Sequence, residues 1–205
     1  SQERAIATQQ TGFWFVAQAR KNLPDHIGGV IWFGTDDASK SPLTPIYCGT
    51  TDVPESLAEG TADMLTYSDK SMFWVTNRIA QFAYLRYDHI GKEVRTVIDE
   101  WENSMIDELK KQDKVLVEMS PKKMTKKATE WSVENAQALW KKWSELDDYL
   151  MVKYIDGNVK LQNEDGSFMN NGHHPSQPEF PEQSGYSEKF LRAIAADNPL
   201  LRIVK

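Results

Sequence analysis

Residues 28–34 read Gly-Gly-Val-Ile-Trp-Phe-Gly, and this stretch decides the class of the fold. Two glycines release the chain from a turn, and the large apolar residues that follow predict a strand. These residues fill both alternating positions of the strand, so we expect other elements to cover both of its faces. What surrounds this strand in the sequence then determines the architecture.

Two more strands are expected on either side of this central one. Residues 11–20 (TGFWFVAQAR) are aromatic and β-branched at their centre, as is typical of a strand. Beyond a polar loop over residues 35–41, the short apolar segment 45–49 predicts a third strand, and residues 50–70 form a connecting loop. A sheet of about three strands leaves an edge without a partner, so part of the sheet is expected to lie outside this chain.

Helices follow from residue 71 onward. Ser71 is the expected N-cap of a helix over residues 73–87, which is apolar nearly all round and should therefore be buried. Two amphipathic stripes come next, with apolar residues three or four positions apart, and Pro121 separates them. The stripes consist of Ile90, Val94, Val97, Trp101, Met105 and Leu109, and of Ala136, Leu139, Trp143, Leu146 and Leu150.

The order of these elements indicates the fold class and the organisation of the chain. Strands followed by helices, without regular strand–helix alternation, are typical of an α+β fold. We expect a single region over residues 1–205, with mainly strands and loops in 1–70 and helices in 71–157. Residues 158–205 are expected to form a loop, followed by one short helix over residues 186–198.

The charge balance argues against some classes of partner. With 24 basic and 30 acidic residues, the formal net charge is -6, whereas a nucleic-acid binder normally carries a basic surplus. Residues 108–130 hold seven lysines and four acids, which predicts a solvated helix face or, alternatively, a patch for a phosphate or a partner. No apolar run reaches the ~20 residues that a membrane-spanning helix needs, so we predict no membrane span. The sequence leaves the cellular compartment open.

The single cysteine and a histidine pair are the first candidates for chemistry. One cysteine, Cys48, excludes an internal disulfide and a metal site made only of cysteines. Cys48 follows the apolar residues Ile46 and Tyr47, and free cysteine is among the most buried residue types. We therefore predict a core residue rather than a nucleophile. His173 and His174 are neighbours in the expected loop, where a surface position is favoured over a metal site.

Two neighbouring acids form a further candidate. Asp36 and Asp37 come directly after the central strand, where acids face a functional site or form an Asx-type turn, and the sequence leaves both interpretations open. The tryptophans of the helical part recur at helical spacing, which indicates core packing rather than a carbohydrate or cofactor site. The sequence has no glycine-rich phosphate loop, no Gly-x-Ser-x-Gly motif and no zinc-type spacing.

Short motifs follow one another in a characteristic order through the first 90 residues. They are Thr11-Gly12-Phe13, Val16-Ala17-Gln18-Ala19-Arg20, Leu23-Pro24-Asp25, Ile27-Gly28-Gly29-Val30, Trp32-Phe33-Gly34, Asp36-Asp37-Ala38, Pro45-Ile46-Tyr47-Cys48-Gly49, Val53-Pro54, Ser71-Met72-Phe73-Trp74-Val75-Thr76-Asn77 and Tyr84-Leu85-Arg86-Tyr87. This ordered set resembles the dipeptidase A-like peptidases, which are cysteine dipeptidases of the N-terminal-nucleophile hydrolase class. After residue 92 the resemblance is weaker and rests on helical character and on Gly185-Tyr186 before Phe190-Leu191-Arg192.

The resemblance implies a fold and a mechanism. The fold would be a four-layer αββα sandwich, and the reaction would be hydrolysis of dipeptides without a cofactor. In that class the first residue of the mature chain is the nucleophile, and its own α-amino group, which titrates near roughly 7.7–8, serves as the general base. The side chain attacks the peptide carbonyl, preset donors stabilise the oxyanion, and water releases the acyl-enzyme.

One departure from the family pattern limits what this chain should do alone. The expected N-terminal cysteine and the strands after it are missing, Cys48 has no free α-amine, and Ser1 opens a polar segment rather than a core strand. We therefore expect the C-terminal portion of such an enzyme, inactive without the N-terminal portion of the same protein, with dipeptides as substrates. Homo-oligomerisation stays open. The alternative is a non-catalytic α+β module that binds a ligand or a protein.

Five residues are predicted to face the substrate pocket of that enzyme. Asp36 and Asp37 would hold the amine of a substrate. Ser71, Trp74 and Asn77 lie at the start of a helix, where polar donors converge readily. Capping, core packing or turn formation is the alternative role for each of the five.

Overall fold

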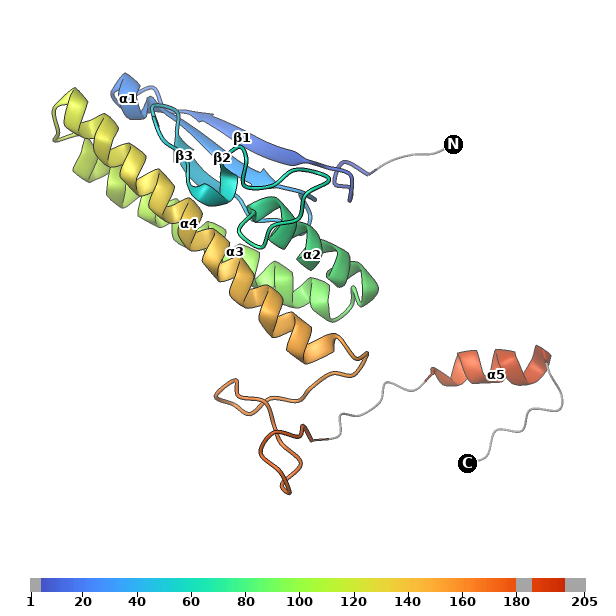
Figure 1. Cartoon of the computed structure of the whole chain (residues 1–205). Helices are drawn as coiled ribbons and strands as arrows, with labels where there is room; N and C mark the ends of the chain where they lie inside the picture. Colours follow the sequence, from blue (N-terminus) through green and yellow to red (C-terminus); the bar gives the residue numbers. More distant parts are fainter. Residues whose placement is uncertain (1–4, 180–185, 198–205) are drawn as a thin grey trace. The chain divides into compact units, whose positions relative to one another are not determined.

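The computed structural model describes residues 5–179 and 186–197 (Figure 1). The chain divides into two compact units, Ser1–Asp148 and Tyr149–Lys205. The elements in chain order are β1 (Phe13–Ala19), α1 (Asp25–Gly28), β2 (Gly29–Thr35), β3 (Thr44–Tyr47), the 3-10 helix η1 (Glu55–Leu57), α2 (Met72–Leu85), α3 (Ile90–Leu116), α4 (Pro121–Tyr154) and α5 (Glu188–Asp197). Ser1, Gly185 and the expected end of the last helix at residue 198 lie outside the described residues. The predicted α+β class is confirmed.

The three predicted strands form one antiparallel sheet in the order β1-β2-β3. β1 pairs with β2 along its whole length, from Phe13 opposite Thr35 to Ala19 opposite Gly29. β3 is shorter and pairs with the first part of β2 on its other side. Consecutive strands are therefore neighbours, as short connections favour.

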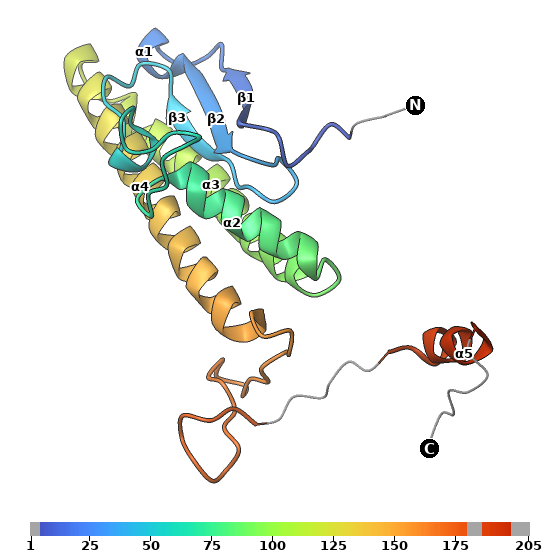
Figure 2. The ribbon, with the colours of Figure 1, turned by 45° about the vertical axis from the view of Figure 1, so that its right-hand side comes forward.

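A hydrophobic core cluster lies between one face of this sheet and the long helices α3 and α4 (Figure 2). The sheet contributes Val30 and Tyr47, while the helices contribute Leu109, Leu116 and Met124 among others. Because side chains alternate along a strand, every second residue of β2 points into this core. Each large apolar side chain buried in this way stabilises the fold by roughly 1.5–3 kcal/mol. This packing holds the sheet on the helices and so fixes the loops at its ends.

Both predicted amphipathic stripes are buried faces of long helices. The buried members of the first stripe are Ile90, Val94, Trp101, Met105 and Leu109. Val97 is only partly buried, and its neighbour Ile98 occupies the core instead. Every member of the second stripe, from Ala136 to Leu150, is buried. Pro121 is the first residue of α4, a position where its missing N–H leaves no helical bond unmade.

The opposite face of the sheet is less covered than the sequence predicts. Phe13 and Phe15 of β1 are 61% and 55% exposed, and Ile31 and Phe33 of β2 are only partly buried. Residues that share a face by strand alternation thus form an apolar surface that is partly open to solvent. The expected cover on both faces of β2 is met in part, because none of its seven residues is exposed while Ile31, Trp32 and Phe33 are only partly buried.

The helix α2 is buried on one side only. Its buried residues are Met72, Val75, Thr76, Ile79, Ala80 and Ala83. Leu85 at its end is 76% exposed, and Tyr84 is also exposed. The prediction of burial all round is therefore wrong, since α2 packs on α3 and on the end of the sheet with one side.

Cys48 is exposed, so the predicted core position is wrong. It follows β3 directly, and Tyr47 before it points into the core. The alternation of side chains therefore turns Cys48 toward the partly open face of the sheet. A Cβ placed on Gly29 would lie only 2.9 Å from the Cys48 sulfur, so glycine is the residue that fits beside this thiol.

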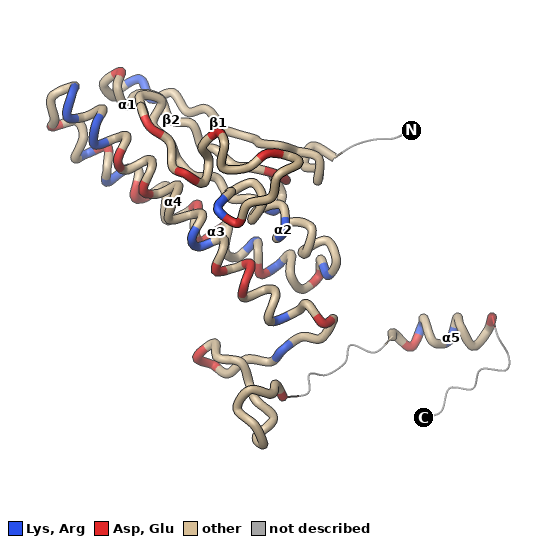
Figure 3. The backbone as a smooth tube through the Cα atoms, in the orientation of Figure 1, with Lys and Arg blue, Asp and Glu red and all other residues tan. Residues whose placement is uncertain are grey.

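Basic residues gather along the first turns of α4, as Figure 3 shows. Lys122, Lys123, Lys126 and Lys127 are exposed there, and the Lys127 ammonium pairs with the Glu130 carboxylate at 2.5 Å. This placement agrees with the solvated helix face expected from the sequence. Within the described ranges, no helix combines the length and the apolar character that crossing a membrane requires.

The second unit is mostly irregular after the end of α4. Tyr149 stacks on Phe168 with ring centres 5.9 Å apart, and isolated bridges order parts of the intervening segments. His173 and His174 are exposed in a loop, as predicted. The predicted last helix is α5, in which no residue is buried.

Candidate functional site

The loop that leaves β2 carries the two acids that the sequence singles out. Asp36 and Asp37 are 1% and 0% exposed, so both carboxylates are buried. Asp36 has a φ of 65°, in the left-handed region that Asp adopts more readily than most residues with a side chain. Its N–H donates to the carbonyl of Gly12 at 2.9 Å, which ties this turn to the residue before β1.

Asp36 contacts Asn77 of α2 directly. The Asn77 side-chain amide donates to Asp36 Oδ1 at 2.9 Å. The other oxygen, Oδ2, is buried and has no hydrogen-bond partner among the described groups. Burial raises the pKa of Asp36, and the bond from Asn77 opposes this effect only in part. The carboxyl group therefore has an oxygen that can accept a further donor.

Asp37 is engaged on both of its oxygens. The Tyr84 hydroxyl donates to Asp37 Oδ2 at 2.6 Å, and the Ser39 N–H donates to Oδ1 at 2.8 Å. The second bond is that of an Asx-type turn, which is one of the two roles left open by the sequence. The bond to Asp37 raises the pKa of the Tyr84 hydroxyl, because the phenol donates its proton to a carboxylate. Asp37 thus fixes the loop to the end of α2.

Lys40, in the same loop, is a residue that sequence reasoning missed. It is 4% exposed, and its ammonium lies 4.4 Å from the centre of the Tyr87 ring. It also donates to the Tyr87 hydroxyl at 3.3 Å and to the Ser39 carbonyl at 3.2 Å. These contacts join the loop after β2 to the segment that follows α2. An isolated lysine in a polar loop gives no sequence signal, so only the structure identifies it.

The other two predicted residues, Ser71 and Trp74, make no side-chain hydrogen bond with Asp36, Asp37 or Asn77 in the described part of the chain. Ser71 is the buried N-cap residue of α2, and its side chain makes no capping hydrogen bond. The Trp74 indole donates to the carbonyls of Asp63 and Thr66, both at 3.1 Å. Trp74 therefore holds the turn that precedes α2. The structure brings Asp36, Asp37 and Asn77 together and gives Ser71 and Trp74 separate surroundings.

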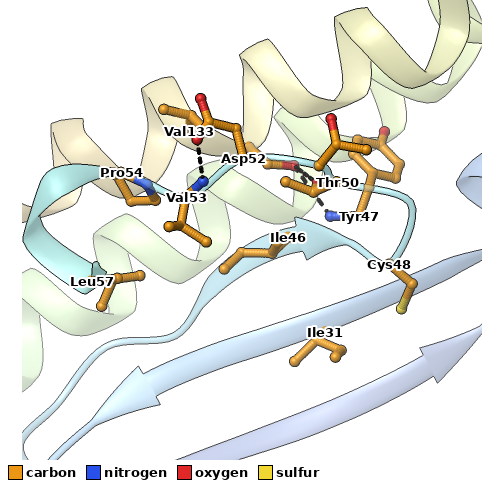
Figure 4. A pocket seen from close by; sticks show the side chains of 12 residues that line it. Ile31, Ile46, Tyr47, Cys48, Thr50, Asp52, Val53, Pro54, Leu57 and Val133 are labelled. Carbon is orange, nitrogen blue, oxygen red and sulfur yellow. Dashed lines mark hydrogen bonds between the residues drawn. The ribbon is translucent and has the colours of Figure 1, made fainter. Parts of the chain in front are cut away.

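A cavity of about 520 Å³ lies beside β3, where Ile31, Ile46 and Cys48 of one sheet face line it (Figure 4). Its walls come from β2, β3, the loop before η1, and α4, and they include Ile31, Ile46, Cys48, Val53, Leu57 and Val133. The lining is mainly apolar, with Thr50 and Asp52 at one side. The acidic cluster around Asp36 does not line it. No group of three or more His, Cys, Asp or Glu in the described ranges could hold a metal ion.

The comparison with known protein families matches the part of the chain that contains the sheet and the Asp36 cluster. Residues 1–100 match the family model of peptidase family C69. The predicted resemblance is confirmed. The probable dipeptidase B of Streptococcus pyogenes serotype M1 is 24% identical over 139 residues. That alignment covers 66% of this chain but 27% of the relative, so the chain spans about a quarter of the relative's length.

Proposed function

We propose that this chain is the C-terminal portion of a dipeptidase whose nucleophile, an N-terminal cysteine, lies outside these 205 residues. The observation that carries the proposal is the match of residues 1–100 to peptidase family C69. The dipeptidase name of the curated relative supports the choice of dipeptides as substrates. In the complete enzyme the terminal α-amine acts as the base, the thiolate attacks the peptide carbonyl, and water hydrolyses the acyl-enzyme.

The cysteine inside the chain does not fit the role of this nucleophile. Cys48 is an internal residue and has no free α-amine to accept its proton. No described histidine is hydrogen-bonded to it, and the His26 ring is in contact with the Thr125 hydroxyl at 3.1 Å. A thiol without a base or another activating group is a weak nucleophile at neutral pH. These features support a nucleophile supplied by another part of the protein.

The partly open face of the sheet supports the four-layer αββα arrangement as part of the proposal. In such a sandwich two sheets pack face to face at about 10 Å, with apolar side chains between them. The surface formed by Phe13, Phe15, Ile31 and Phe33 has the apolar character that an inner face requires. A second sheet from the remainder of the enzyme would remove this surface from water, at a gain of roughly 25 cal/mol per Å².

We assign the substrate amine to Asp36, whose Oδ2 can accept another donor. Asp37 already accepts two hydrogen bonds, so in the proposal it orients the loop beside the substrate. Asn77 holds the Asp36 carboxyl group, and Ser71 and Trp74 support the wall at the start of α2. Because Asp36 is 1% exposed, the amine reaches it only when the loop after β2 moves aside.

Hydrolysis of dipeptides by the full-length protein tests the assignment. Asp36, Asp37 and Asn77 are replaced singly by Ala, and Asp107→Ala on the exposed side of α3 serves as the control. We expect kcat/KM to fall for Asp36→Ala and Asn77→Ala and to stay unchanged for the control. Unchanged kcat/KM in all three variants would refute the substrate contacts. Dipeptide cleavage by the 205-residue chain alone would refute the claim that the nucleophile lies elsewhere.

A second candidate function is a non-catalytic module that binds a ligand or a protein. The apolar cavity of about 520 Å³ is the observation that favours it, because concave apolar sites are typical of small-molecule binding. The coding sequence upstream of Ser1 separates the two candidates. A cysteine after a short leader, about one domain's length upstream, supports the dipeptidase. A start codon directly before Ser1 supports the module.

A further inference from the structure

The outer edges of β1 and β3 differ in whether their backbone groups are free to pair with another strand. The outer edge of β3 is not free. Cys48 donates its N–H to the carbonyl of Gly29 on β2, so by alternation the backbone groups of Pro45 and Tyr47 point away from β2. Pro45 has no N–H to offer. The Tyr47 N–H donates to the Ser132 hydroxyl of α4 at 3.2 Å. No further strand can therefore form a regular ladder on β3.

The outer edge of β1 is open. Arg20 donates its N–H to Gly28 at 2.8 Å, and Asp36 donates to Gly12 at 2.9 Å, so the even-numbered residues of β1 bond to β2. The odd-numbered residues then direct their N–H and C=O groups outward, and they are Phe13, Phe15, Ala17 and Ala19. Among the described strands none lies on this side of β1.

The sequence of β1 has none of the usual protections of an edge strand. Natural edges carry charged residues, prolines or bulges, or are very short, because a free edge otherwise pairs with other chains. The seven residues FWFVAQA contain no charge and no proline, and their pairing with β2 is continuous. Phe13, Phe15 and Val16 are 61%, 55% and 50% exposed. This composition is typical of a strand inside a sheet.

A groove beside β1 offers space for the side chains of an additional strand. A cavity of about 460 Å³ lies between β1, β2 and α3, with Val16, Gln18, Trp32 and Ile106 in its walls. It lies on the face of the sheet that carries Val16 and Gln18. Phe13 and Phe15 lie on the opposite face. An added strand would therefore meet apolar surface with both sets of its alternating side chains.

We infer that β1 is an interior strand of the complete sheet and pairs along its outer edge with a strand from the same protein outside residues 1–205. The inference rests on the proposed function, which requires such a portion. The alignment covers 27% of the curated relative's length, so the relative extends far beyond the aligned region. A second copy of this chain joined through β1 would lengthen the sheet but leave its apolar face uncovered. The remainder of the enzyme can supply both the strand and the cover.

Residue-resolved amide hydrogen exchange of the full-length protein tests this pairing. The inward N–H groups of Trp14, Val16 and Gln18 are an internal control, because they bond to β2 in either case. We expect the outward amides of Phe15 and Ala17 to exchange about 100-fold or more slowly than unprotected amides. Outward amides that exchange freely beside protected inward amides would overturn the inference. If the slow exchange of the outward amides disappears on dilution to the monomer, the edge pairs with a second copy of the chain, and the inference is overturned as well.

A pair of substitutions at one outward position gives a second measurement. Ala17→Pro removes the outward N–H, whereas Ala17→Val keeps it and favours a strand. In the full-length protein we expect Ala17→Pro, and not Ala17→Val, to lower the unfolding midpoint, because proline is tolerated at a free edge but not inside a sheet. Equal midpoints would contradict the pairing. Dipeptide hydrolysis is assayed separately, so free amides in an active enzyme reject only the strand, and protected amides in an inactive protein reject only the function.

Discussion

Asp113 and Asp36 are acids in two different polar clusters of the sheet region, and they differ in how completely they are bonded. Asp113 of α3 accepts from the Arg20 guanidinium at 2.5 Å on one oxygen and from the Tyr47 hydroxyl at 2.8 Å on the other. Asp36 accepts from Asn77 on one oxygen, while the other has no partner among the described groups.

This difference indicates what each cluster is for. A largely buried carboxylate that accepts hydrogen bonds on both of its oxygens fixes the packing of the elements that it joins, although Arg20 Nε has no partner among the described groups. Arg20 directly follows β1 and also donates to the Ile27 carbonyl, so the Asp113 cluster fastens the β1–β2 hairpin to α3. Asp36 has a left-handed backbone conformation, and its buried Oδ2 accepts no hydrogen bond from the described groups. Backbone strain and buried polar atoms without partners concentrate at functional sites. We therefore expect substitutions at Asp113 to change stability and substitutions at Asp36 to change activity.

The largest effect is expected for Asp113→Ala. This change leaves the Arg20 guanidinium, whose side chain is 13% exposed, without its carboxylate. Breaking a fully buried pair from one side destabilises by about 3–5 kcal/mol, and because this pair is only partly buried we expect a loss near the lower end of that range. Denaturant unfolding of the full-length protein measures this loss. Asp107→Ala on the same helix is the control, because its carboxylate pairs with Lys110 at the surface and should add little. A loss at Asp113 as small as that of the control would contradict a fastening role.

A smaller effect, on activity, is expected for Asp36→Asn. Removal of the charge weakens the bond to a substrate ammonium, and a charged hydrogen bond of about 1.5–3 kcal/mol corresponds to roughly 10- to 100-fold in kcat/KM. The unfolding free energy should not fall comparably, because the variant removes a buried carboxylate with an unbonded oxygen. Steady-state kinetics with dipeptides and denaturant unfolding measure the two quantities. A large loss of stability with unchanged kcat/KM would place Asp36 in the same class as Asp113.

The pH dependence of stability sharpens the same contrast. Burial raises the pKa of Asp36 in the folded protein, so the folded state holds this proton more tightly than the unfolded chain does. The contribution of Asp36 to stability is therefore greatest below the unfolded pKa of about 3.9 and decreases as pH rises through the folded pKa. Unfolding free energies of the parent protein and of Asp36→Asn, measured from low to neutral pH, should differ in that direction. A difference that is independent of pH would contradict the raised pKa.

The sequence predicted the elements well because their signals are local. The aromatic and β-branched residues of β1, the glycine pair before β2 and the stripes of α3 and α4 are patterns within single elements. Burial depends instead on which layers are present. The run that forms β2 indicates a strand covered on both faces, yet one face is partly open in the described residues. Cys48 is exposed for the same reason, although its neighbours in the sequence are apolar.

The candidate site was predictable only in part. The position of Asp36 and Asp37 after β2 follows from the strand pattern, but their burial does not. The bond between Asp36 and Asn77 joins residues 41 positions apart, and no local pattern encodes such a contact. The sequence also gives no sign that Trp74 bonds two carbonyls of the preceding turn. Their roles toward substrate stay predictions.

The smallest effect is expected for Tyr84→Phe, which separates Asp37 from Asp36 within the same loop. The variant removes the hydroxyl that donates to Asp37 Oδ2 and leaves the Asx-type bond from Ser39 in place. Because Asp37 is 0% exposed, its Oδ2 loses this donor without regaining full contact with water, and the loss of stability should be about 1–2 kcal/mol. If Asp37 only orients the loop, kcat/KM should change much less than in Asp36→Asn. A fall in kcat/KM as large as that of Asp36→Asn would show that the two acids act on the substrate together.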